Sequence, residues 1–85
     1  MYFPLEMSTM SEESFGWIIR DGYKRWYAKL QHGVIWTFDT DRDHATVFAG
    51  EALARQVARE HYRRQCYVIE PVLIRPGEVP LETLP

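Results

Sequence analysis

Only one stretch of this sequence has the period of a helix, and it lies among four short runs of strand-forming residues. Gly50 to Gln65 (GEALARQVAREHYRRQ) repeats its apolar residues at about 100° per residue, which predicts an amphipathic helix. The predicted apolar side holds Leu53, Ala54, Val57, Ala58 and His61. Three strand runs precede this helix and one follows it. The order β-β-β-α-β predicts an α+β domain.

The strand runs are separated by residues typical of tight turns. Asp21-Gly22, the strongest short hairpin signal, separates FGWIIR from YKRWYAKL, and Gln31-His32-Gly33 precedes the run Val34 to Phe38. Cys66 to Ile74 (CYVIEPVLI) forms the last run, in which Pro71 indicates an edge strand or a bulge. We therefore expect an antiparallel sheet of about four strands with one helix packed on one face.

A chain of 85 residues has room for a single core. We assign this domain to residues 15–75, with a flexible N-terminal arm at 1–14 and a proline-rich tail at 76–85 that lies extended on the surface. No run reaches the roughly 18 apolar residues of a membrane span, and the N-terminus lacks the basic and apolar regions of a signal peptide. These features predict a cytoplasmic protein with no membrane partner.

The chain has one cysteine, Cys66, and no motif typical of a cofactor site. A single cysteine permits neither an internal disulfide nor a Cys-based zinc site, so we expect Cys66 to be a small buried hydrophobic residue. Glycine-rich phosphate loops, the G-x-S-x-G nucleophile motif and H-E-x-x-H are all missing from the sequence. We expect no cofactor and no enzymatic activity.

The stretch FDTDRDH is the best candidate for a metal or catalytic loop. Asp39, Asp41 and Asp43 match the first, third and fifth positions of a calcium loop. His44 stands where that loop requires glycine, and Gly50 where it requires glutamate. The calcium interpretation therefore lacks the sharp turn and the bidentate ligand.

Two catalytic interpretations of the same stretch are also weak. VIWTFDTDRD resembles the D-x-D motif of haloacid-dehalogenase-like phosphatases, which implies Asp39 as the nucleophile and Asp41 as the general acid. The chain after this motif is too short for the parallel sheet of those enzymes. His44 could form an acid–base pair with an aspartate, yet no nucleophile accompanies it. We favour a structured connector in which Asp39 closes the strand and Asp43 caps a short helical turn. No metal site and no catalytic residue is predicted.

A two-residue Asp21-Gly22 loop would set the register of the first hairpin, with Arg20 facing Tyr23 and Trp17 facing Trp26. The tryptophan face would then meet the helix, in a core of Trp17, Trp26, Trp36, Leu53 and Val57. The opposite face would be open unless the N-terminal arm or a second copy of the chain covers it, so a homodimer is among the expected states. Its basic and aromatic residues form the predicted binding surface, namely Arg20, Tyr23, Arg25, Tyr27 and Lys29.

The charge distribution predicts a second, weaker surface. Ten Lys and Arg lie between Arg20 and Arg75 against seven acids, a surplus of three, while both ends of the chain are acidic. On the helix, Arg55, Arg59 and Arg63 line up at i, i+4 and i+8. Either surface could contact nucleic acid, although the basic surplus is small for a dedicated nucleic-acid binder.

Several short motifs carry a resemblance to a class of proteins. The D-G hairpin, W-T-x-D at Trp36 to Asp39, A-T-x-F at Ala45 to Phe48 and the helical EALA resemble the small orphan proteins of bacteriophages and mobile elements, over roughly residues 17 to 70. That class includes the anti-CRISPR inhibitors, several of which are strongly acidic DNA mimics, unlike this slightly basic body. The resemblance implies an accessory or inhibitor protein that binds a host protein or nucleoprotein complex in the host cytoplasm.

The sequence thus predicts a non-enzymatic protein-binding module. Exposed aromatic residues and arginines, the types enriched at binding hot spots, support this prediction. The alternatives are a nucleic-acid-binding protein and a structural or assembly subunit of a larger particle.

Overall fold

The computed structural model describes residues 14–23, 25–63 and 66–84 and shows a small α+β domain. Its elements, in chain order, are β1 (Phe15–Asp21), β2 (Tyr27–Gln31), β3 (Ile35–Asp39), the 3-10 helix η1 (Arg42–His44), α2 (Glu51–His61) and β4 (Tyr67–Leu73). The predicted order is confirmed, and η1 is the short helical turn that was expected after the third strand. The predicted N-terminal arm lies outside the described residues, except for Ser14.

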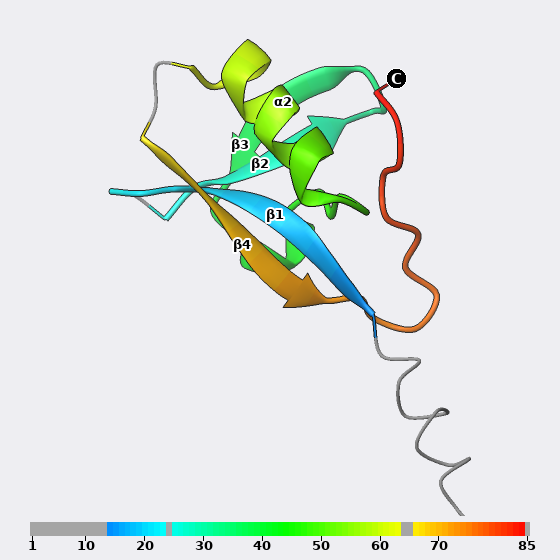
Figure 1. Cartoon of the computed structure of the whole chain (residues 1–85). Helices are drawn as coiled ribbons and strands as arrows, with labels where there is room; N and C mark the ends of the chain where they lie inside the picture. Colours follow the sequence, from blue (N-terminus) through cyan, green and yellow to red (C-terminus); the bar gives the residue numbers. More distant parts are fainter. Residues whose placement is uncertain (1–13, 24, 64–65, 85) are drawn as a thin grey trace, which may run out of the picture.

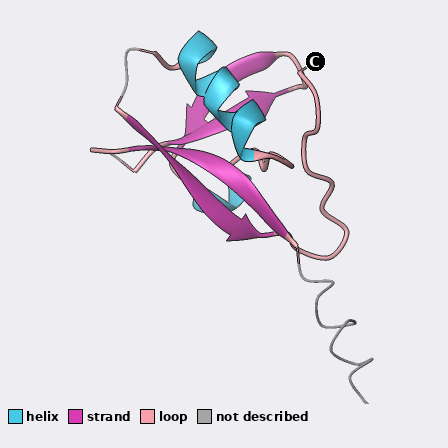
Figure 2. Cartoon of the chain, viewed as in Figure 1, coloured by secondary structure: helices cyan, strands magenta, loops and turns pink. Residues whose placement is uncertain are grey.

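All neighbouring strands of the sheet are antiparallel, in the order β3-β2-β1-β4. Figure 1 shows α2 lying across one face of the sheet, while Figure 2 shows η1 on the other side. In the described part of the chain, no helix has both the length and the apolar character to span a membrane.

The register of the first hairpin differs from the prediction. Arg20 pairs with Tyr27 rather than with Tyr23, and the Asp21 N–H donates to the Trp26 carbonyl at 2.9 Å. The loop therefore covers residues 22–26, and the Asp21 side chain holds it by accepting the Tyr23 N–H at 2.8 Å. The pairing partner of Arg20 shifts by four residues, which is an even number. The side chains of β1 and β2 that were predicted to share a face of the sheet therefore still do so.

Beyond this pair, β1 and β2 separate, and the chain between η1 and α2 fills the gap. Thr46 binds β2 twice, because its N–H donates to the Ala28 carbonyl at 3.0 Å and its hydroxyl oxygen accepts the Leu30 N–H at 2.8 Å. On the other side, Phe48 and Trp17 form an isolated antiparallel bridge. The sequence A-T-V-F thus satisfies the backbone groups of both strands where they no longer reach each other.

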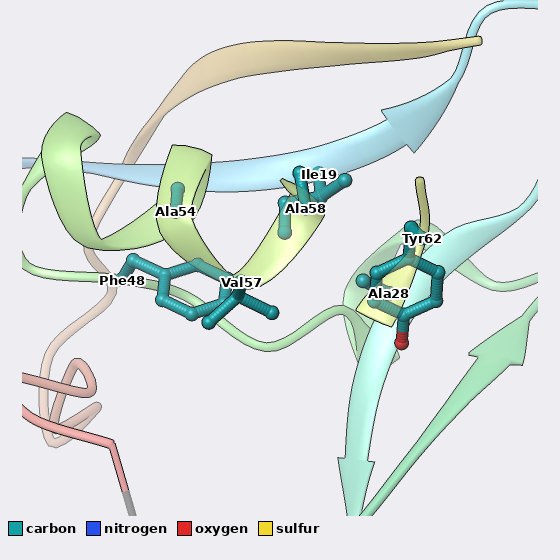
Figure 3. Packing of buried hydrophobic residues seen from close by; sticks show 7 residues of the cluster. All are labelled: Ile19, Ala28, Phe48, Ala54, Val57, Ala58 and Tyr62. Carbon is teal, nitrogen blue, oxygen red and sulfur yellow. The ribbon is translucent and has the colours of Figure 1, made fainter. Parts of the chain in front are cut away.

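The core lies between the sheet and α2, and Figure 3 shows its seven buried members. They are Ile19, Ala28, Phe48, Ala54, Val57, Ala58 and Tyr62. The prediction is confirmed for Val57, whereas Trp17, Trp36 and Leu53 pack against the cluster while half-buried. Trp26 lies outside the cluster and instead packs on Phe38, with ring centroids 5.1 Å apart. Tyr62, which the prediction did not place in the core, lies at its centre together with Phe48.

Helix α2 is shorter than predicted, and its end explains the position of Tyr62. Gly50 is the N-cap and Tyr62 the C-cap, with φ of −128°, so the chain leaves the helical path there. The Tyr62 ring turns inward, and its hydroxyl donates to the Thr37 carbonyl at 2.7 Å. His61, predicted on the apolar side, is exposed and contacts only the Trp36 ring among the described rings, at 5.8 Å.

The last strand and the tail close the domain. Pro71 lies opposite Trp17 in β4, an edge strand as predicted. The tail is extended but is not confined to the surface as predicted, because Leu81 bridges Phe48 in parallel and both Leu81 and Leu84 pack against the core. Their apolar side chains cover core surface that a single helix leaves open.

Candidate functional site

The five residues of the predicted binding surface separate into two groups in the structure. Arg20, Tyr27 and Lys29 lie on the sheet face opposite α2, as the register pairs show. Tyr23 and Arg25 belong to the loop of residues 22–26, because the hairpin is longer than predicted. The predicted continuous surface is therefore wrong.

The sheet face carries acids that neutralise its bases. Arg20 Nε lies 2.8 Å from a Glu70 carboxylate oxygen, and Lys29 Nζ lies 3.3 Å from an Asp39 oxygen. Strand pairing brings these acids in, since β4 places Glu70 and β3 places Asp39 on the same face as the cations. This pairing weakens the basic-face argument for nucleic-acid binding, because a phosphate would have to compete with a carboxylate.

The same face is also partly covered. Ile18, whose side chain points to this side, is 2% exposed, and Ala45 of the connector is buried as well. Arg42 of η1 reaches Glu70 with an N···O distance of 3.4 Å. The expectation of an open face is therefore wrong at its centre, where the connector takes the place of an arm or a second copy.

The aspartates of FDTDRDH act as turn and helix caps. Asp39 accepts the Asp41 N–H at 2.8 Å, and Asp41 accepts the Asp43 N–H at 2.9 Å as the N-cap of η1. The cap is thus Asp41 rather than the predicted Asp43. Among the described residues no group of three or more potential metal ligands converges. The carboxylate oxygens of Asp39 and Asp41 are directed at backbone donors, as in Asx turns.

Asp39 is the most strongly engaged of these aspartates. The Asp41 N–H, the His44 imidazole at 3.1 Å and the Lys29 ammonium lower the pKa of Asp39 below its ordinary value of 3.8, and partial desolvation opposes this shift. The His44–Asp39 contact is solvent-exposed and shares its carboxylate with Lys29. This arrangement fixes the strand end, and it places His44 on the wall of an open hollow of about 650 Å³ between η1 and the tail.

The loop of residues 22–26 carries the most exposed aromatic side chain among the described residues. Tyr23 is 84% exposed, and Arg25 is exposed beside it. Figure 1 shows this loop at the left end of the molecule, beyond the sheet. Its base is fixed, because the Gly22 N–H donates to the Cys66 carbonyl and Asp21 is a buried acid that holds the Tyr23 N–H.

Cys66 adjoins this loop and is exposed, so the prediction of a buried cysteine is wrong. Its backbone pairs with Gly22, which directs the side chain toward the loop rather than into the core. The neighbouring Cys66 thiol raises the pKa of Tyr23 above its ordinary value, with smaller contributions from desolvation and from Asp21. Tyr23, Arg25 and Cys66 form the surface that we call the loop patch.

The predicted helix stripe is only partly present. Arg55 is paired with Glu51 at 2.6 Å, in the i, i+4 arrangement of an exposed helix. Arg59 and Arg63 are exposed, but Arg63 follows the end of α2 and so does not continue the stripe along the helix. Apart from the paired Arg55, the predicted stripe leaves Arg59 and Arg63 as exposed guanidinium groups, and they do not lie one helical turn apart on α2 as predicted.

A hollow of about 420 Å³ lies between η1, β4 and the tail, and no pattern in the sequence predicted it. Ile18 and Val72 contribute apolar surface, and Arg42 and Arg75 lie on its rim. Both arginines have acidic neighbours, since Arg42 contacts Glu70 and Arg75 lies within 4.0 Å of acids. The positive charges on the rim of the hollow are therefore neutralised by nearby acids, and the hollow is not an anion-binding site.

No family model, curated protein or solved structure matches this chain. The functional argument consequently depends on the chemistry of the described surfaces. Of these, the loop patch combines the highest exposure with the residue types that dominate binding energy at interfaces.

Proposed function

We propose that this chain is a non-enzymatic protein-binding module that contacts its partner through the loop patch. The observation that carries the proposal is the 84% exposure of Tyr23 on a loop with a fixed base. A large aromatic side chain kept in water on an anchored loop gains most by desolvation in a partner's pocket. Because the base of the loop is already ordered, binding would cost little backbone entropy.

The charge next to Tyr23 supports a protein partner with an acidic or carbonyl-rich pocket rim. Arg25 is exposed, and a guanidinium supplies several donors in a fixed plane. The Tyr23 hydroxyl, which lies next to the Cys66 thiol, adds a further hydrogen-bonding group. The narrower proposal, inhibition of a host protein or nucleoprotein complex, depends on the resemblance to small phage proteins.

The experiment is an affinity capture from a lysate of the native host cell, with bound proteins identified by mass spectrometry. The test variant combines Tyr23→Ala with Arg25→Glu, and the matched control is Arg59→Glu, an exposed charge reversal on the helix. We expect a stoichiometric partner to bind the wild type and the control but not the test variant. Circular dichroism must show an intact fold in all three proteins.

Two results would contradict the proposal. If the partner still binds the test variant, the loop patch is not the interface. If Arg59→Glu alone abolishes capture, the interface is on α2. A gel shift with mixed DNA and RNA at two salt concentrations addresses the nucleic-acid alternative, since binding through phosphates weakens steeply as salt rises.

A further inference from the structure

The two edges of the sheet are protected to different degrees. In β4, every second residue directs its backbone N–H and C=O groups to β1, and the residues between direct theirs to the free edge. The bonds from the Gly22 N–H to the Cys66 carbonyl and from the Ile74 N–H to the Ser14 carbonyl show that the even-numbered residues face β1. Pro71, opposite Trp17, therefore faces the free edge. Since proline has no N–H, the centre of this edge cannot donate to another strand.

Within the part of the chain that the structure describes, the β3 edge has no such protection. The Ala28 carbonyl and the Leu30 N–H bond to Thr46, on the side of β2 away from β3. The residues of β2 that bond to β3 are therefore Tyr27, Lys29 and Gln31. By the same alternation, Trp36 and Phe38 direct their N–H and C=O groups to the free edge. No proline, glycine or lysine interrupts β3.

Apolar side chains accompany these outward-directed backbone groups. Val34 is 71% exposed, Ile35 55% and Phe38 37%, all at or next to the β3 edge. An edge strand with outward donors and acceptors and exposed β-branched and aromatic residues is a template for an additional strand. This edge is separate from the loop patch, since Val34 and Ile35 lie at the opposite end of β3 from Asp39, which pairs with Tyr27 beside the loop.

We propose that two copies of this chain pair antiparallel through β3, with Trp36 at the two-fold axis. In this register Trp36 faces Trp36 of the second copy, and both direct their backbone groups across the interface, as a hydrogen-bonded pair requires. Ile35 then faces Thr37 of the second copy, and Val34 faces Phe38. β-branched and aromatic cross-strand pairs of this kind are favourable.

Charge and symmetry select a second copy as the occupant. The register about Trp36 leaves Asp39 outside the overlap, whereas a register about Thr37 would place Asp39 against Ile35. Pairing of β3 with β4 of another copy is blocked by Pro71, so the contact closes as a dimer and does not continue into a filament. The dimer forms one eight-stranded sheet that carries two loop patches, which would bind a divalent partner by avidity.

The first test is the oligomeric state of the full chain, measured by sedimentation velocity over a dilution series. We expect a concentration-dependent dimer, and we expect Ile35→Lys to raise its Kd about tenfold or more because the substitution acts twice across the axis. The matched control is Val68→Lys, which changes a 39% exposed valine on the β4 edge and leaves dimerisation intact.

The second test is the register. In a Cys66→Ser background, a protein with Ile35→Cys is mixed with a protein with Thr37→Cys and oxidised. These positions form a non-hydrogen-bonded pair with Cα atoms about 4.5 Å apart, close enough for a disulfide, so we expect the mixed dimer to dominate.

Three results would overturn the proposal. A monomer at every concentration would leave the β3 edge to a strand of a different protein. A dimer that survives Ile35→Lys, or that Val68→Lys disrupts equally, would use another surface. Self-coupling of the Thr37→Cys protein in place of the mixed dimer would contradict the register about Trp36.

Discussion

Trp17 and Phe48 exchange two backbone hydrogen bonds, with N···O distances of 2.9 and 2.7 Å, across a gap in the sheet. The gap opens because β1 and β2 share one ladder pair, Arg20 with Tyr27, and then diverge. The connector before α2 therefore acts as a short fifth strand, and Phe48 places its ring between the sheet and the helix. The core of the domain depends on this insertion, because Phe48 is fully buried and stacks on Trp36 at 5.7 Å.

Gly16 allows this close approach, which gives the first prediction. A Cβ at position 16 would collide with the Val47 side chain and come within 3.0 Å of the Phe48 carbonyl oxygen. We expect Gly16→Ala to destabilise the fold by about 1–3 kcal/mol in a denaturant titration, as overpacking does. The control is Gly50→Ala, whose added Cβ meets no atom within 4 Å and which should cost about 0.5 kcal/mol as a weaker N-cap. Equal losses would argue against the crowded contact.

The sequence predicted the elements of this fold but not the way the strands separate. Local signals, such as the period of residues 50–65 and the strand runs, depend on neighbouring residues and are confirmed by α2 and the four strands. The length of the first loop did not follow from a local signal. Asp21-Gly22 predicts a two-residue turn, but the Asp21 side chain instead accepts the Tyr23 N–H and stabilises a longer loop. That choice depends on the connector, in which Thr46 contacts Leu30 of β2 16 positions away and Phe48 pairs with Trp17 of β1 over a longer separation.

The candidate surfaces show the same limit. Alternation placed Arg20 and Lys29 on one face, and the structure confirms this placement. Their partners Glu70 and Asp39 come from other strands, and without the strand order no pattern in the sequence could assign them to the same face. Similarly, Cys66 is apolar by type, but its pairing with Gly22 at the sheet end exposes it.

Tyr62 provides a prediction at alkaline pH. Burial raises the pKa of Tyr62 from 10.0 to about 12, and a backbone hydrogen bond from Lys29 opposes the shift. Since the folded state holds this proton more tightly than the unfolded state, its contribution to stability is complete below pH 10 and is lost as pH rises toward 12. Tyr62→Phe should therefore make the loss of stability above pH 10 less steep.

At neutral pH the same variant should cost about 1 kcal/mol, because the bond to the Thr37 carbonyl is lost. The measurement is urea unfolding at several pH values, with Tyr27→Phe as the control on the opposite sheet face. An unchanged slope in Tyr62→Phe above pH 10 would contradict the assignment.

Asp41 supports a prediction about metal binding. Its carboxylate accepts the Asp43 N–H at the start of η1, and that of Asp39 is shared among a backbone N–H, His44 and Lys29. We expect calorimetric titration with calcium or magnesium to show no binding in the wild type. Asp41→Ala should cost about 0.5–2 kcal/mol of stability as a lost cap, and Asp41→Asn should cost less. Micromolar metal binding that Asp41→Ala abolishes would replace the cap with a metal site.

Thr46 joins the connector to β2 and allows the sharpest test of the inserted strand. Its hydroxyl oxygen accepts the Leu30 N–H at 2.8 Å, a donor that β1 would satisfy in an unbroken sheet. Thr46→Val keeps the shape of the side chain but removes the acceptor, so we expect a loss of about 1–3 kcal/mol in urea unfolding. Thr46→Ser keeps the oxygen and should retain most of the stability. Hydrogen exchange should show faster exchange of the Leu30 amide in Thr46→Val only; equal exchange in the two variants would mean that Leu30 has another acceptor and that the gap is closed in a different way.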